Sequence, residues 1–113
     1  PELISFFSDK ITTCHSNKIS DVIIDPGFGF GKKINQNFKI LKNLEVFQVL
    51  NVPIMVGLSR KSMIYKSLEI EPADALNGTS VLNAVALLKK ANILRVHDVK
   101  EAKESIELCK KLV

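Results

Sequence analysis

Apolar residues recur along this chain with two different spacings, which predict helices and strands in alternation. Four stretches have apolar residues at steps of three and four, as in an amphipathic helix: 2–16, 36–50, 72–91 and 99–112. A shorter helix is expected at residues 61–68. Three short apolar runs are typical of strands buried in a parallel sheet: 21–25, 54–56 and 93–97.

The order of these elements is one helix followed by three strand–helix units with short connections. Such repeated units form a parallel sheet with right-handed crossovers. Asn35 and Asp98 are expected to cap the helices that follow them, and Glu101 completes a capping-box pattern with Asp98. Gly78 lies within a helical pattern, which predicts either a close packing contact or a break. The pattern predicts an α/β fold.

Composition narrows the class of protein and the kinds of ligand. The 113 residues are enough for one domain with a core, and no apolar run reaches the roughly 20 residues of a membrane span. The net charge of +4 arises from lysines spread along the helices, with no basic stripe interleaved with aromatics. We therefore expect small anionic ligands, with no nucleic acid and no membrane as partner. Cys14 and Cys109 both fall on helical patterns, which predicts free thiols and a reducing, cytoplasmic setting.

Polar residues follow each predicted strand at its carboxyl end, where α/β proteins place their chemistry. Asp25 ends the first strand and precedes a run with glycine at alternate positions, 27–31. This run is not the dinucleotide-binding fingerprint, because its third glycine comes one residue early. The other candidates follow the second and third strands: Ser59, Arg60, Lys61, Arg95 and His97. Together they predict a site for an anionic ligand with a hydrogen-bonding ring.

Three ordered stretches together resemble one family: residues 25–32 (DPGFGFGK), 57–62 (GLSRKS) and 95–98 (RVHD), with residues 77–79 (NGT) between the last two. The family is dihydropteroate synthase, an enzyme of folate biosynthesis. The resemblance implies a partial (β/α)8 TIM barrel, consisting of the last three βα units preceded by one helix. Residues 1–113 would then be the carboxyl-terminal fragment of a single pterin-binding barrel domain, since a full barrel needs about 250 residues.

The family joins 4-aminobenzoate to a dihydropterin-methyl diphosphate and releases pyrophosphate. By resemblance, Asp25 accepts hydrogen bonds from pterin N–H groups and offsets positive charge as the diphosphate leaves. Asp25 and Lys61 would be the catalytic residues. The resemblance also places Lys61 and Arg95 at the pterin, and Arg95 and His97 at the diphosphate. It assigns four residues to 4-aminobenzoate: Phe30, Ser59, Arg60 and Lys61.

The resemblance further implies a Mg2+ ion on the diphosphate, with its protein ligand outside this fragment. It implies a homodimer in the full-length form and a target for sulfonamides. The chain alone is expected to be inactive, because the motifs of the amino-terminal barrel strands are not in it. Three alternatives stay open: a pterin-binding methyltransferase-type barrel, a catalytically silent binding or assembly module, and a doubly wound phosphate-binding domain. For single residues, the simpler interpretations are an Asx turn at Asp25 and an ordinary basic loop at residues 59–62.

Overall fold

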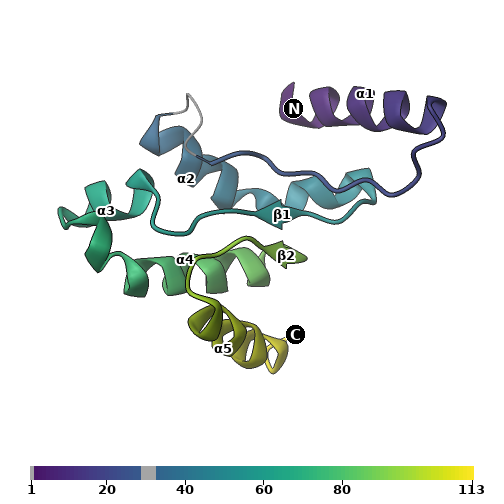
Figure 1. The fold of residues 1–113 in the computed structure, drawn as a ribbon. Helices are drawn as coiled ribbons and strands as arrows, with labels where there is room; N and C mark the ends of the chain where they lie inside the picture. The colour runs from purple at the N-terminus through teal and green to yellow at the C-terminus, as the bar shows by residue number, and fades with distance from the viewer. Residues whose placement is uncertain (1, 29–32) are drawn as a thin grey trace.

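The computed structural model describes residues 2–28 and 33–113, and its elements follow the predicted order (Figure 1). The helices and strands are α1 (Glu2–Ser16), α2 (Ile34–Lys42), η1 (Leu44–Leu50), β1 (Met55–Val56), α3 (Ser62–Leu68), η2 (Pro72–Asp74), α4 (Leu76–Leu88), β2 (Ile93–Leu94) and α5 (Val99–Lys110). The two 3-10 helices, η1 and η2, stand where the sequence pattern predicted continuous α-helix.

The sheet is parallel, as the sequence predicted. β1 pairs with β2 in the register Met55–Ile93 and Val56–Leu94. The segment before β1 joins the other side of the sheet through a parallel bridge between Ile24 and Ile54. Two backbone hydrogen bonds hold that bridge, since the Ile24 N–H donates to the Pro53 carbonyl at 3.0 Å and the Met55 N–H donates to the Ile24 carbonyl at 2.8 Å. The three strand ends therefore point to the same edge.

Two of the predicted strands are much shorter than expected. The prediction of a strand at residues 21–25 holds only at the Ile24 bridge, and Ile23 is 51% exposed. In the described part of the chain no strand lies beyond this segment to pair with it. The strand predicted at 93–97 ends at Leu94, although the Arg95 N–H still donates to the Val56 carbonyl at 2.9 Å.

Two predicted helices are interrupted, and the cap predicted at Asn35 is wrong. The stretch 36–50 divides at Asn43 into α2 and η1, and the stretch 72–91 divides at Ala75 into η2 and α4. Asn35 does not cap α2 but lies inside it. The helix begins after Lys33, whose backbone N–H donates to Gln36 Oε1 at 2.9 Å.

Gly78 is retained inside α4 because α3 packs closely against it. A Cβ built at Gly78 would lie 2.5 Å from Cγ2 of Ile64, which is buried. We expect Gly78→Ala to lower the free energy of unfolding by about 1–2 kcal/mol, because overpacking outweighs the better helix propensity of alanine. Urea unfolding measures this, with Asn77→Ala on the exposed side of the same turn as the control. A Gly78→Ala chain as stable as the control would contradict the packing argument.

The core lies between the strands and the helices and contains Phe28, as predicted, together with η1 residues Leu44 and Phe47. The chain is more extended than a compact domain of its length. Its radius of gyration is 14.7 Å, against about 13 Å expected. Figure 1 shows α1 and α5 on opposite sides of the strands. Both carry exposed apolar side chains, and Val99 at the start of α5 is 57% exposed.

Candidate functional site

The ends of the first and third strands meet through an ion pair. Nη1 of Arg95 lies 3.1 Å from Oδ2 of Asp25. The other carboxylate oxygen of Asp25 accepts the backbone N–H of Gly27 at 2.9 Å, which is the Asx turn expected before a Pro-Gly pair. The carboxylate thus shapes the turn with one oxygen and faces Arg95 with the other. Both interpretations of Asp25 made from the sequence are compatible with this geometry.

Gly57 gives the guanidinium of Arg95 its place. A Cβ at Gly57 would lie 2.5 Å from Nη2 of Arg95 and 3.0 Å from its Cζ and Nε. Gly57 is buried directly after β1, so the guanidinium lies close over its backbone. Only a residue without a side chain allows this approach.

Lys61 connects the second strand end to the segment that follows Asp25. Its Nζ donates to the backbone carbonyl of Phe28 at 2.7 Å. Burial lowers the pKa of Lys61, and the charge of Arg95 lowers it further, while Asp25 acts in the opposite direction. Lys61 is therefore a partly desolvated cation within the field of both charges at the first and third strand ends.

Ser59 and His97 link the second and third strand ends. The backbone N–H of His97 donates to Oγ of Ser59 at 3.2 Å, and that Oγ lies 2.7 Å from Nδ1 of the imidazole. Ser59 is buried, and its hydroxyl is engaged with His97. The second ring nitrogen, Nε2, is on the far side of the imidazole from this contact.

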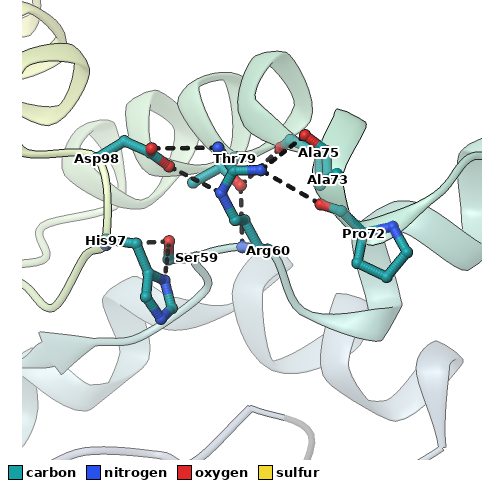
Figure 2. A network of polar contacts seen from close by, with 8 residues as sticks. All are labelled: Ser59, Arg60, Pro72, Ala73, Ala75, Thr79, His97 and Asp98. Carbon is teal, nitrogen blue, oxygen red and sulfur yellow. Dashed lines mark hydrogen bonds and ion pairs between the residues drawn. The ribbon is translucent and has the colours of Figure 1, made fainter.

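The guanidinium of Arg60 is held by protein acceptors. Its guanidinium forms a two-pronged contact with the carboxylate of Asp98, with Nε–Oδ2 and Nη2–Oδ1 both 3.1 Å. The neighbouring carboxylate raises the pKa of Arg60. Nη1 donates to the backbone carbonyls of Ala73 at 2.9 Å and Pro72 at 3.3 Å, as Figure 2 shows. The side chain is held by protein acceptors, and it does not line the cavity where the other predicted residues meet.

That cavity has a volume of about 210 Å³ at the carboxyl edge of the sheet. Its lining residues are Gly57, Ser59, Lys61, Arg95, Val96 and His97. Val96 lines the cavity although it lies between Arg95 and His97, because β2 ends at Leu94 and residues 95–97 do not alternate as in a strand. Two cations and an imidazole in one hollow suit a small anion. Phe30, predicted for 4-aminobenzoate, and Lys32 lie outside the described residues.

Comparison with known proteins identifies the family. A model for pterin binding enzymes matches residues 1–97. This chain belongs to the pterin-binding enzyme family. It is similar to dihydropteroate synthase from Escherichia coli K12, with 38% identity over 109 residues that make up 95% of this chain and 39% of the relative.

Solved structures of dihydropteroate synthases superpose closely on this chain. The Yersinia pestis enzyme matches with a TM-score of 0.94 and 33% identity, over 98% of this chain and 46% of that one. The Thermus thermophilus enzyme in complex with 4-aminobenzoate matches with a TM-score of 0.93 and 33% identity, over 99% of this chain and 44% of that one. The chain thus spans less than half of the relatives it matches. The prediction of a partial TIM barrel is confirmed.

Sequence reasoning missed the residues that support this candidate site. Thr79, in the NGT stretch, accepts the backbone N–H of Arg60 at 3.0 Å. Asp98 was predicted to cap α5 with its side chain, but no such bond forms, and the carboxylate holds Arg60 instead. A carboxylate directly after the RVH triplet was the available signal. Its partner could not be inferred, because the two residues are 38 positions apart.

Within residues 2–28 and 33–113, no three His, Cys, Asp or Glu side chains lie together as a metal site. None of the helices in this same part of the chain is long and apolar enough to cross a membrane. Both cysteines are free thiols, as predicted, although Cys14 is half-buried and only Cys109 is buried.

Gly57→Ala is expected to weaken the site without destabilising the fold. The added methyl displaces the flexible end of Arg95, so the free energy of unfolding should change by less than about 1 kcal/mol, while the contact between Arg95 and Asp25 is lost. Binding of inorganic pyrophosphate should weaken at least tenfold. Isothermal titration and urea unfolding measure both effects, with Gly78→Ala as the opposite case, destabilised but with the site intact. Unchanged pyrophosphate affinity would rule out a role for this close approach.

Proposed function

We propose that this chain supplies the carboxyl-terminal part of a dihydropteroate synthase. The complete enzyme would form a C–N bond between the amine of 4-aminobenzoate and the methylene of a dihydropterin-methyl diphosphate, with release of pyrophosphate. The observation that carries the proposal is the meeting of three strand ends, because Lys61, Arg95 and His97 line one cavity and Asp25 pairs with Arg95 beside it. Asp25, Lys61, and the pair of Arg95 and His97 come from different βα units and interact there or beside it.

The cations of the cavity fit the diphosphate. Arg95 offers a planar fork of N–H donors and Lys61 a compact ammonium, and both bind phosphate oxygens well. The Ser59 contact occupies Nδ1 of His97 and leaves Nε2 for a ligand. These three groups would hold the diphosphate in the substrate and stabilise the negative charge that grows on it as the C–O bond breaks.

Asp25 fits the opposite task. A carboxylate is an acceptor without donors, so it matches the adjacent N–H groups of a pterin ring. The oxygen that now faces Arg95 is the one a ring N–H would use, while the other oxygen stays with Gly27. As the diphosphate departs, the pterin methylene becomes positive, and a fixed carboxylate favours that charge.

The binding of 4-aminobenzoate needs revision relative to the resemblance. Two of the four residues it assigned, Ser59 and Arg60, have their polar groups engaged with His97 and Asp98. Lys61 remains as the cation that faces the cavity wall. We therefore assign the contact with aminobenzoate to Lys61 and leave Phe30 as a prediction.

Several features of the complete enzyme stay proposals. They are a Mg2+ ion with its ligand upstream, a homodimer, a cytoplasmic location and sulfonamide binding. The described residues do not form a metal cluster, so no step here is assigned to Mg2+. The residues present account only for binding the two substrates and for placing charge around the breaking bond.

The test is reconstitution. The purified chain should show no synthase turnover, because it spans 39% of the Escherichia coli relative and lacks the remaining strands of the pocket. A chimera that joins the upstream part of that relative to this chain should release pyrophosphate and form dihydropteroate. The intact Escherichia coli enzyme is the positive control, and Lys66→Met in the chimera controls for surface changes. Robust turnover by the isolated chain would refute the fragment interpretation.

The alternatives predict different outcomes of the same experiment. A chimera that folds and binds pyrophosphate but never turns over would identify a silent binding module. A methyltransferase-type barrel would bind a pterin without using 4-aminobenzoate. Only turnover that depends on both substrates supports the synthase.

A further inference from the structure

The backbone of Arg60 adopts an unfavourable conformation, which local contacts hold in place. Its φ angle is 54°, in the left-handed region that a residue with a side chain adopts at a cost. Its backbone N–H donates to Oγ1 of Thr79 at 3.0 Å, and that hydroxyl donates onward to the Ala75 carbonyl at 2.7 Å. Thr79 is buried, so the backbone of the loop after β1 is fixed to α4.

The side chain of Arg60 binds two further segments. The carboxylate of Asp98, in the loop after β2, accepts hydrogen bonds from Nε and Nη2 of Arg60. The backbone carbonyls of Ala73 and Pro72, in η2, accept hydrogen bonds from Nη1. The side chains of Arg60 and Asp98 are only 28% and 22% exposed. Truncating one member of such a shielded, two-pronged pair leaves the other charge without its partner.

A second contact lies directly beside the first. Ser59 precedes Arg60 and contacts His97, which precedes Asp98, so two consecutive residues of one loop hold two consecutive residues of another (Figure 2). We call these four residues the loop clasp. Ser59 and His97 line the cavity, whereas Arg60 and Asp98 do not. Lys61, the next residue after the clasp, also lines the cavity.

We propose that Arg60 is a positioning residue, and that its contact with Asp98 sets His97 and Lys61 on the walls of one anion site. The expected effect of Arg60 on catalysis rests on the proposed function, whereas the contacts within the loop clasp do not depend on that function. Direct binding of aminobenzoate by Arg60 would require its guanidinium to leave Asp98 and two carbonyls. The clasp instead makes Arg60 and Asp98 act as one unit.

The first experiment uses the 113-residue chain and needs no activity. Arg60→Gln and Asp98→Asn should each lower the midpoint of unfolding. The double variant should have a midpoint no lower than that of the less stable single variant. The control is the exposed pair of Lys110 and Glu107, whose changes should leave the midpoint within about 1 °C. Additive losses of stability at Arg60 and Asp98 would show that the two side chains do not act as one unit, and would overturn the proposal.

A spectroscopic signal distinguishes positioning from stability alone. The chain has two histidines, and His15 is exposed in the last turn of α1, far along the chain from the clasp. In 15N spectra, Arg60→Gln should shift the imidazole signals of His97 and leave those of His15 unchanged. Arg60→Lys, which keeps the charge without the fork, should give a smaller shift of the same kind. An unmoved His97 in a folded variant would overturn the proposal.

The second experiment uses the chimera that tests the proposed function. Arg60→Gln should lower kcat at least tenfold with KM for 4-aminobenzoate within twofold, and Arg60→Lys should recover part of kcat. A tenfold rise in KM for 4-aminobenzoate with unchanged kcat would make Arg60 a substrate ligand and refute positioning. If the chimera with Arg60 intact has no turnover, only the proposed function is refuted. The unfolding and His97 measurements then still test whether Arg60 positions His97.

Discussion

In the reconstituted enzyme, Asp25→Asn is expected to reduce kcat by about 100- to 1000-fold, the range found when one preorganised electrostatic contact to a developing charge is removed. The free energy of unfolding should change by no more than about 1 kcal/mol, because the Arg95 side chain of the ion pair is 53% exposed. No other single substitution is expected to separate activity from stability so widely.

The two oxygens of Asp25 explain why the effects separate. Asparagine keeps a carbonyl oxygen for the Gly27 N–H, so the turn forms as before. It replaces the second oxygen with an N–H2 group, which meets the donors of Arg95 or of a pterin as donor against donor. The charge that would stabilise the pterin cation is also gone, so kcat should fall further than pterin affinity.

The measurement combines thermal unfolding, pterin affinity and turnover of the chimera. Asp21→Asn is the matched control, because Asp21 is an exposed carboxylate at the other end of the same short segment. It should leave all three quantities unchanged. If Asp25→Asn has near-normal pterin affinity and kcat, Asp25 serves only the turn, and the site loses its main support.

Element order and the meeting of the strand ends could be predicted from the sequence, because both follow from local apolar spacing. A period of two or of three to four residues is visible without any tertiary contact. Asp25 and Arg95 meet across 70 residues of chain, yet each needed only to be placed at a strand end. Parallel topology then brings them together.

Element lengths and side-chain partners could not be predicted in the same way. A strand persists only where a neighbouring strand satisfies its backbone, so residues 21–25 shrink to one bridge although their apolar pattern is unbroken. Arg60 is a long cation whose direction depends on which carboxylate lies nearby, and its φ of 54° turns it away from the cavity. Nothing in the local pattern encodes either fact.

The second large effect is expected at Lys61. Lys61→Met keeps most of the apolar stem and removes the ammonium group. In the chimera it should lower kcat/KM by at least about 30-fold, since truncating a desolvated, hydrogen-bonded charge costs roughly 2 kcal/mol or more. The loss of activity has two causes. The ammonium is proposed to bind substrate, and it also donates to the Phe28 carbonyl at 2.7 Å, a hydrogen bond that holds the segment after Asp25.

Initial rates over a range of both substrates measure the loss. Lys66→Met is the control, because Lys66 is exposed on α3, the helix that directly follows Lys61, and should change kcat/KM less than twofold. Lys61→Arg keeps the charge with a different shape and should recover only part of the activity. Equal effects of Lys61→Met and Lys66→Met would remove Lys61 from the site.

The pH dependence gives an independent check on Lys61, because burial and Arg95 lower its pKa from the ordinary 10.5. If the cation is required, kcat/KM should fall on the alkaline side at a pH below 10.5, and Lys61→Arg should lack that fall. Stability should move in the opposite direction. Between the lowered pKa and 10.5 the unfolded chain binds more protons than the folded chain, so the free energy of unfolding rises with pH relative to Lys61→Met. An alkaline fall that persists unchanged in Lys61→Arg would assign the titration to another group.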